Sequence, residues 1–213
     1  MNGVVLEKWQ FRAEERLSVP VVPDGCRDLI CINFGEERPS WLVSNLDETT
    51  RLVAVDRGFE ITGYRLRPGT RIPVAGLISS IGETDPNDGG INEIIENMCS
   101  LDSSVDEALG CIGSLSGNIN DAAKVIGVRV RTLQRLLQKH TAHPPVFWLR
   151  LARARRAAKS ISQGSSLAEA AYNAGYCDQS HMNREFRKWF GTTPSGFIND
   201  AVQASMIFDK GFA

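Results

Sequence analysis

The second half of the chain contains one pattern twice, and this internal repeat most constrains how the chain can fold. Its matching segments are "INDAAKVIGV" at 119–128 with "LAEAAYNAGY" at 167–176, and "RTLQRLLQKHTAHPP" at 131–145 with "SHMNREFRKWFGTTP" at 180–194. Each copy has small alanines, a glycine (Gly127 or Gly175) and then an amphipathic segment. Because glycine readily adopts the left-handed conformation of a tight turn between helices, each copy is predicted to be a helix-turn-helix unit.

The second copy indicates what such a unit can bind. In "GYCDQSHMNREFRKWFG" at 175–191, Asp178 can cap a helix, and one side of that helix is apolar: Met182, Phe186, Trp189 and Phe190. The other side carries mixed hydrogen-bond donors and acceptors: Gln179, Ser180, His181, Asn183 and Arg184. Such a set can distinguish base pairs in the DNA major groove, so these residues are predicted to face the groove. His181 taken alone is more typical of an ordinary surface position, but its place in this set favours a base or phosphate contact.

Charge is distributed unevenly along the chain, although the formal net charge is only −1. Residues 1–112 hold 10 Lys and Arg against 19 Asp and Glu, whereas residues 113–213 hold 14 against 6. In the basic half, a long helix is predicted at about 145–162, where Pro144 and Pro145 mark its start and arginines cover much of its surface. The asymmetry indicates that the second half meets a polyanion and the first does not.

About 80 residues at the start of the chain follow a different pattern. Short apolar runs such as "DLICINF", "RLVAV" and "FEITGYRL" are separated by turn signals such as "VPDG" and "RPGT". These runs are typical of strands in a small barrel or sandwich. The pattern becomes helical from about residue 90, so the boundary is expected between residues 82 and 104. The expected fold class is α+β, with a mainly-β domain at 1–90, a linker with a helix at 91–104, and an all-α domain after it.

Capping boxes predict where three of the helices begin, because a Ser, Thr or Asn followed three residues later by an acidic residue satisfies the first amide groups of a helix. The pairs are Ser104 with Glu107, Ser166 with Glu169 and, in a weaker form, Asn118 with Asp121.

The five cysteines, at positions 26, 31, 99, 111 and 177, are odd in number and contain no CxxC spacing. Reduced and mostly buried thiols are therefore expected, and neither a disulfide framework nor a zinc site is predicted. No apolar run approaches the roughly 18 residues that a membrane span needs. The N-terminal sequence "MNGVVLEKWQF" lacks the basic-then-apolar pattern of a signal peptide, so a cytoplasmic protein is expected.

The basic half resembles the DNA-binding domain of the AraC/XylS transcription regulators. The similarity lies in "AAKVIGVRVRTLQRLLQKHTAHPPVFWLRLARARRA" and, more specifically, in "SLAEAAYNAGYCDQSHMNREFRKWFGTTPSGF". It covers about residues 105–199 and implies a homeodomain-like, seven-helix domain with two helix-turn-helix units. The implied parts are a first unit at about 119–141, a linker helix at 145–162, a second unit at about 167–190 and a tail at 200–213. The second helix of each unit, the recognition helix, is expected to enter one of two successive major grooves.

The resemblance extends the set of candidate DNA-binding residues to the first unit. By position, its recognition helix uses Arg131, Thr132, Gln134 and Arg135. Arginine suits guanine and glutamine suits adenine, while some of the arginines can instead hold phosphates. Weaker candidates for contacts with the DNA backbone are Arg129, Lys139, Arg153, Arg187 and Lys188.

The chain departs from the family pattern mostly in the first unit. Arg129 stands where the family often has a capping Ser, and "AHPP" at 142–145 replaces the usual Gly-x-Ser-Pro. Losing a Ser cap costs on the order of 1 kcal/mol, so the first unit is expected to dock more loosely and to contribute less specificity. In the second unit Met182 replaces the usual aromatic residue, a change that an apolar site tolerates.

The N-terminal half more faintly resembles the cupin-like sensor domains of some of these regulators, through "VPDGCRDLI" at 22–30 and "GYRLRPGT" at 63–70. The resemblance implies a small effector inside the barrel, or dimerisation. All three histidines lie in the basic half, which argues against a metal-dependent cupin enzyme. Asp24, Arg27 and Asp28 are either ligand-binding residues or turn and salt-bridge residues, and turn propensity favours the second role.

Three classes of function follow from these observations. The favoured one is a sequence-specific DNA-binding regulator of transcription. An enzyme with a DNA-targeting domain is disfavoured, because no nucleophile elbow or phosphate loop is present; no catalytic residue, metal ligand or cofactor is predicted. A degenerate regulator that binds protein as an adaptor is disfavoured by the polar side of 179–184. The predicted partner is double-stranded DNA, with RNA polymerase implied by resemblance, and with a small effector and a homodimer left open; no membrane partner is predicted.

Overall fold

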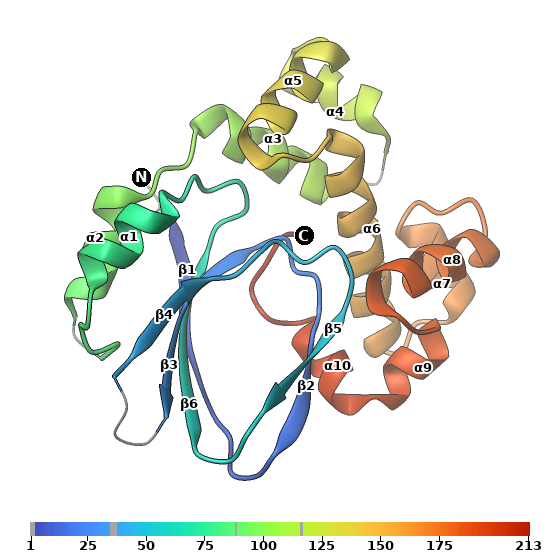
Figure 1. Cartoon of the computed structure of the whole chain (residues 1–213). Helices are drawn as coiled ribbons and strands as arrows, with labels where there is room; N and C mark the ends of the chain where they lie inside the picture. The colour runs from blue at the N-terminus through green and yellow to red at the C-terminus, as the bar shows by residue number, and fades with distance from the viewer. Residues whose placement is uncertain (1–2, 35–37, 88, 116) are drawn as a thin grey trace.

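The computed structural model describes residues 3–34, 38–87, 89–115 and 117–213. In its first part, six strands form two antiparallel sheets: β1 (Val5–Arg12), β2 (Leu17–Val21), β3 (Arg27–Phe34), β4 (Ser40–Val43), β5 (Arg51–Val55) and β6 (Phe59–Leu66). Four of them pair in the order β1-β6-β3-β4, while β2 pairs with β5 in a separate two-stranded sheet (Figure 1). Alternate residues of β3, Leu29 and Cys31, are fully buried, as expected for a strand with one face on a core.

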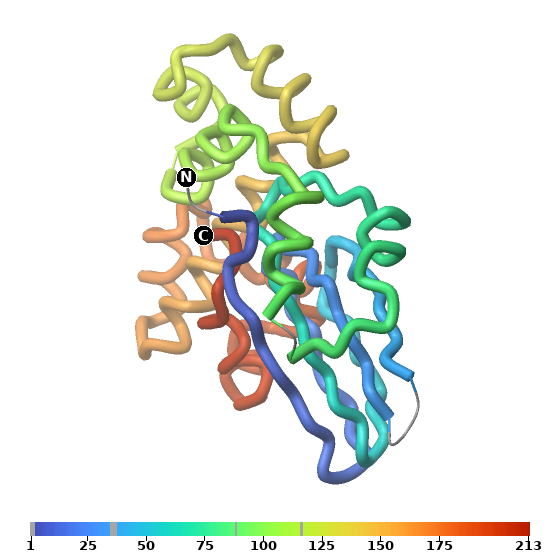
Figure 2. The backbone as a smooth tube through the Cα atoms, turned by 90° about the vertical axis from the view of Figure 1, so that its left-hand side faces the viewer, coloured from blue at the N-terminus to red at the C-terminus, as the bar shows by residue number. Residues whose placement is uncertain are grey.

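Two helices, α1 (Val74–Ile81) and α2 (Gly90–Met98), cover the four-stranded sheet beside β1 and β4 (Figure 2). Leu77 of α1 and Ile91 and Ile95 of α2 are fully buried in one cluster with strand residues such as Leu29 and Leu66. The segment 91–104 therefore includes a helix that packs on the strands. The exact division into domains at 1–90 and 105–199 remains a prediction.

The second part of the chain is helical. Its elements are α3 (Ser103–Ser114), α4 (Ile119–Ile126), α5 (Val130–Thr141), α6 (Pro145–Ser162), α7 (Leu167–Asn173), α8 (Gln179–Phe190), α9 (Pro194–Asn199) and α10 (Ala201–Met206). Figure 1 shows α6 running between the pair α4–α5 at one end and the pair α7–α8 at the other. The expected fold class, strands followed by an all-α part with two helix-turn-helix units, is confirmed.

Local capping explains most of the helix starts. The capping boxes Asn118–Asp121 and Ser166–Glu169 are both formed, at the starts of α4 and α7. The prediction that Ser104 caps α3 is wrong. Asp102 caps it, because its carboxylate accepts a hydrogen bond from the Ser104 amide at 2.9 Å, and the helix begins one residue earlier than Ser104.

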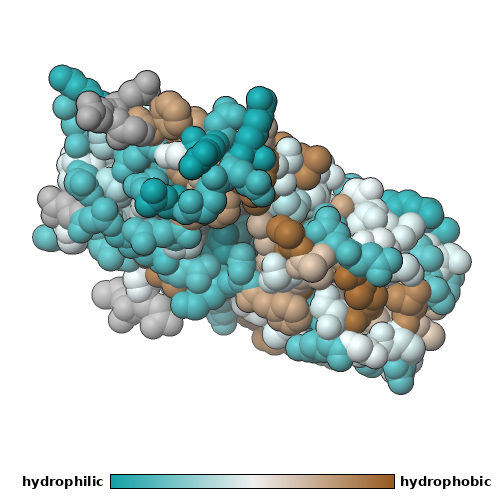
Figure 3. Space-filling view, turned by 90° about the horizontal axis from the view of Figure 1, so that it is seen from below, coloured by the Kyte–Doolittle hydropathy of each residue, from teal (hydrophilic) through white to brown (hydrophobic). Residues whose placement is uncertain are grey.

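All five cysteines are free thiols, as expected from their number and spacing. Cys26, Cys31 and Cys99 are buried and Cys177 is exposed. In the described parts of the chain, no helix combines the length and apolar character needed to cross a membrane. Several large apolar side chains are exposed, including Leu52 at 71% and Val202 at 53%. Figure 3 shows apolar patches among hydrophilic ones on the face seen from below.

Candidate nucleic-acid interface

The second helix-turn-helix unit is built from α7, a glycine turn and α8. Ala170 and Ala171 are buried where α7 meets the neighbouring helices, and Gly175 adopts a left-handed φ of 81° in the turn. Asp178 then caps α8, since its Oδ1 atom accepts a hydrogen bond from the His181 amide at 2.7 Å. The apolar side of α8 is buried as predicted: Met182, Phe186, Trp189 and Phe190.

That packing turns the opposite side of α8 outward. Gln179, Ser180 and Arg184 are exposed, whereas His181 and Asn183 are half-buried. The His181 ring lies edge-on to the Tyr176 ring, with a centroid distance of 5.2 Å, and the Oδ1 atom of Asn183 is buried. The structure thus brings all five predicted residues together at the start of one helix, with three of them fully available to a partner.

The first unit repeats this arrangement with α4 and α5. Ala122 and Ala123 are buried, and Gly127 has a left-handed φ of 77°. Leu133 and Leu137 hold α5 to the helical core. All four residues predicted to contact bases are exposed on α5: Arg131, Thr132, Gln134 and Arg135.

Cationic and amide side chains follow the exposed side of α5 over most of its length. Arg131, Arg135 and Lys139 recur every four residues, so they share one face of the helix. Together with Gln134, Gln138 and Pro144 they line a shallow surface hollow of about 690 Å³. A row of donors of this kind suits an elongated polyanion better than a small molecule.

The residues predicted to contact the DNA backbone fall into two groups. Four are exposed on or beside the recognition helices: Arg129, Lys139, Arg187 and Lys188. Arg153 of α6 is half-buried instead, and its Nη2 atom donates a hydrogen bond to the Gly117 carbonyl at 2.7 Å. This bond ties α6 to the loop before α4, so Arg153 serves the fold. Its contact with phosphate remains a prediction.

Two residues that support α8 were not foreseen. The Thr50 amide, from the loop before β5, donates a hydrogen bond to the Trp189 carbonyl at 2.8 Å. Gln203 of α10 is buried, and its Nε2 atom donates to the Phe190 carbonyl at 3.0 Å. The last carbonyls of a helix have no partner within the helix, so these bonds stabilise its end. Nothing local in the sequence indicates the Thr50 bond, because Thr50 lies 139 residues from Trp189 along the chain. Gln203 is closer in sequence, but it comes from a separate helix.

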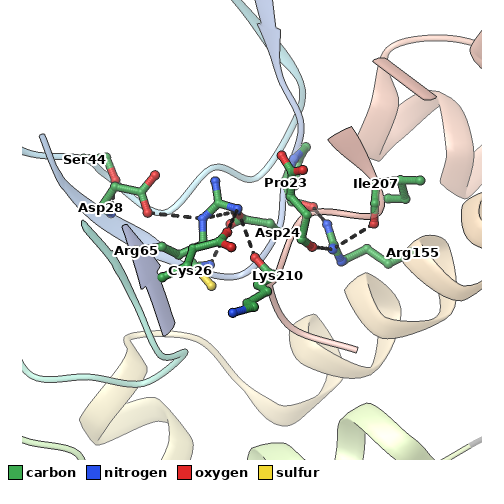
Figure 4. A network of polar contacts seen from close by, with 11 residues as sticks. Pro23, Asp24, Cys26, Asp28, Ser44, Arg65, Arg155, Ile207 and Lys210 are labelled. Carbon is green, nitrogen blue, oxygen red and sulfur yellow. Dashed lines mark hydrogen bonds and ion pairs between the residues drawn. The ribbon is translucent and has the colours of Figure 1, made fainter. Parts of the chain in front are cut away.

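In the strand part, Asp24 and Asp28 take the turn and ion-pair roles that the sequence favoured. Asp24 Oδ1 accepts a hydrogen bond from the Cys26 amide at 2.8 Å. The Arg65 Nε atom lies 3.2 Å from Asp24 Oδ2 and 3.4 Å from Asp28 Oδ1 (Figure 4). Burial raises the pKa of Asp28 to about 6, and the nearby Arg65 charge opposes that shift.

Arg27 lines a small cavity between the strand part and the helical part. Its Nε atom donates to the Ser44 carbonyl at 2.8 Å. The cavity measures about 90 Å³, and Arg67, His140 and Trp148 also line it. Drug-sized ligands occupy pockets of roughly 300–1,000 Å³, so this cavity is too small for a ligand of that size. A small effector of the N-terminal half remains a prediction.

Comparison with known proteins finds a helix-turn-helix family match in this region and similarity to regulators of transcription. A family model described as a helix-turn-helix domain matches residues 122–200. The chain is similar to the transcriptional activator RhrA of Rhizobium meliloti, with 30% identity over 130 residues that cover 60% of this chain and 39% of RhrA. It is also similar to the HTH-type transcriptional regulator RipA of Corynebacterium glutamicum, with 32% identity over 85 residues, or 40% of this chain and 26% of RipA.

The chain spans less than two fifths of the length of these curated relatives. Among solved structures, it is similar to a transcriptional regulator from Chromobacterium violaceum that is described by its AraC-type DNA-binding domain. That similarity covers 51% of this chain and 96% of the other, with a TM-score of 0.42 and 20% identity.

Proposed function

We propose, from the helix-turn-helix family model that matches residues 122–200 and from the resemblance to AraC-type regulators, that this chain is a sequence-specific DNA-binding regulator of transcription. Its recognition helices α5 and α8 enter two successive major grooves on one side of the duplex. The observation that carries the proposal is the pair of equivalent helices, each buried on one side and polar on the other, joined by the single helix α6.

The side chains divide by the chemistry they offer. Two kinds of side chain suit particular bases, because each can form two parallel hydrogen bonds with the edge of one base. Arginine suits guanine (Arg131, Arg135 and Arg184), and glutamine suits adenine (Gln134 and Gln179). The exposed basic residues near the helix ends neutralise phosphates and set the register of the protein on DNA. This division supports base recognition by both units, with the better-capped α8 contributing more of the specificity.

The remaining parts of the proposal concern the whole protein. We place it in the cytoplasm, with RNA polymerase as a protein partner, and assign it no enzymatic activity or cofactor. The strand half, which comprises β1–β6 with α1 and α2, serves as a sensor for a small effector or as a dimerisation domain. A single chain already presents two recognition helices, so DNA binding does not require a dimer.

A binding selection tests the proposal directly. Purified protein is mixed with a random duplex pool at moderate salt, and the bound DNA is sequenced. We expect a motif with two blocks about one helical turn apart. A single block would mean that α5 only holds the backbone. Absence of any enriched motif, together with weak DNA binding that does not fall steeply with salt, would contradict the proposal and favour a protein-binding adaptor.

A further inference from the structure

The last residues of the chain lie between the two halves of the molecule. After α10 the chain runs between α6 and the turn that joins β2 to β3, and Figure 1 shows the C-terminus between the strands and α6. Ile207 is fully buried and Phe212 is 5% exposed. The Phe212 ring lies edge-on to that of Trp148 on α6, at a centroid distance of 5.1 Å. The segment 207–213 is therefore anchored at Ile207 and Phe212, while residues 208–210 between them are exposed.

Arg155, in the middle of α6, is the buried centre of this junction. Its side chain is 0% exposed. Its Nη1 atom donates to the Pro23 carbonyl at 3.2 Å, and its Nη2 atom donates to the carbonyls of Ile207 at 3.2 Å and Asp209 at 3.3 Å (Figure 4). One guanidinium thus joins α6, the strand half and the C-terminal segment. Without such partners a buried charge is strongly unfavourable, so the three carbonyls fix where Arg155 can sit.

Backbone contacts at Asp24 form a second, independent part of the junction. The Phe212 amide donates to the Asp24 carbonyl at 2.7 Å. A Cβ atom placed on Gly211 would lie 2.8 Å from the same carbonyl oxygen, closer than real Cβ contacts allow. Arg65 Nη1 also donates to the Lys210 carbonyl at 3.0 Å. Residue 211 must therefore lack a side chain for the segment to lie this close to the strand half.

We propose that segment 207–213 is an intramolecular clasp that fixes the strand half to α6, with Arg155 as its positioning residue. The strand half also holds the end of α8 through Thr50. Because α6 connects the two helix-turn-helix units, the clasp and the Thr50 bond together fix α8 relative to α5. Releasing the clasp leaves each recognition helix intact but loosens the spacing between them.

Hydrogen exchange tests the clasp without any DNA. In Gly211→Ala the new methyl group displaces the segment from Asp24, and we expect the Phe212 amide to exchange at least about tenfold faster. Arg155→Met, which removes all three carbonyl contacts, should raise exchange in the same segment. The matched control is Gly110→Ala, since a Cβ at this exposed position of α3 meets nothing within 4 Å. Exchange in Gly211→Ala equal to that in the control would overturn the clasp.

The effect on spacing rests on the proposed function and needs a second measurement. Affinity is compared for a two-block site, the same site with two inserted base pairs, and a single block. Wild type should discriminate against the insertion, while Gly211→Ala should lose most of that preference and keep its affinity for the single block. An unchanged preference in a variant with raised exchange would overturn the positioning role. If no variant binds DNA specifically, the proposed function fails, and hydrogen exchange still decides the clasp.

Discussion

The two recognition helices have the same design but are held differently at their ends. The repeat aligns Arg129 with Asp178 before the helices and Ala142 with Gly191 after them. Asp178 caps α8 with its carboxylate, whereas Arg129 makes no side-chain cap on α5. Gly191 and Ala142 both adopt left-handed conformations, with φ of 69° and 60°, and only the glycine does so without strain.

The strand half adds to this difference. It holds the end of α8 through the Thr50 amide, while α5 ends in a local network around Thr141. Thr141 Oγ1 donates to the Leu137 carbonyl at 2.7 Å and accepts from Trp148 Nε1 at 3.1 Å. The end of α8 is thus hydrogen-bonded to a distant part of the chain, whereas the Thr141 hydrogen bonds at the end of α5 are local, and the strand half approaches there through the pair His143 Nε2–Glu48 Oε1 at 4.0 Å. A signal that acts on the strand half should therefore reach α8 more directly than α5.

The largest expected effect is on the free energy of unfolding and concerns Asp28. This residue pairs with Arg65, which also donates a hydrogen bond to the Lys210 carbonyl in the clasp. The folded pKa of Asp28, about 6, lies above the ordinary value of 3.8, so the folded protein binds the proton more tightly than the unfolded chain. The free energy of unfolding should accordingly rise as pH falls from about 6 to 4, by up to about 3 kcal/mol from this group. Asp28→Asn should remove that contribution.

The measurement is denaturant unfolding of wild type and Asp28→Asn between pH 4 and 7. Carboxyl groups outside the Arg65 network titrate alike in both proteins, so the difference between the two curves reports the titration of this network around Asp28. A difference that stays constant across this range would show that Asp28 does not titrate near pH 6 in the folded protein.

The next effect compares base recognition by the two helices. Arg184 and Arg135 occupy equivalent positions in the repeat, and both are exposed. Arg184→Ala should weaken specific binding by roughly 1–3 kcal/mol if the arginine contacts a base edge. Arg135→Ala should weaken specific binding by less, because α5 lacks a side-chain cap and is expected to dock less firmly in the groove. Anisotropy titrations on the selected site measure both, with Arg57→Ala in an exposed turn of the strand half as the control. Equal losses would remove the asymmetry between the units.

Much of this comparison was predictable from the sequence, because it rests on local rules. The repeat, its glycine turns and the capping residues all act within a few positions, so the bounds of α6 and the starts of α4, α7 and α8 follow from spacing. The missing cap at Arg129 was equally visible. The Ser104 prediction failed because Asp102, two positions earlier, caps the helix through the Ser104 amide and thereby makes Ser104 part of the first turn.

The junction between the halves was not predictable in this way. Arg155 is one of several arginines on a basic helix; its spacing of four from Leu151 and three from Ala158 places it on the apolar side, unlike the exposed Arg150, but this spacing does not reveal its partners. Its partner Pro23 lies 132 residues away along the chain. Segment 200–213 looked like a tail because its apolar residues, such as Ile207 and Phe212, show their partners only after the chain has folded. Long-range hydrogen bonds to backbone carbonyls leave no side-chain pattern to detect.

A smaller effect is expected from the residue that precedes each recognition helix, Asp178 before α8 and Arg129 before α5. Asp178→Ala should lower the free energy of unfolding by about 0.5–2 kcal/mol, because it leaves the first amides of α8 without an acceptor. Arg129→Ala removes no cap and should change it little, whereas Arg129→Ser should add a cap and stabilise α5. Denaturant unfolding measures all three. A destabilising Arg129→Ala would mean that this arginine already supports α5 in a way that the capping comparison overlooks.

The smallest effect lies at the other end of the same helices and should have opposite signs in the two units. Ala142→Gly relieves a left-handed alanine and should stabilise the protein by roughly 0.5–1 kcal/mol, whereas Gly191→Ala should destabilise it by a similar amount. The gain at 142 is limited, because glycine also increases the conformational entropy of the unfolded chain. Thermal unfolding of both variants checks the signs. If Ala142→Gly also destabilises, the entropy that glycine adds to the unfolded chain outweighs the relieved strain, and the left-handed alanine does not make the first unit the looser one.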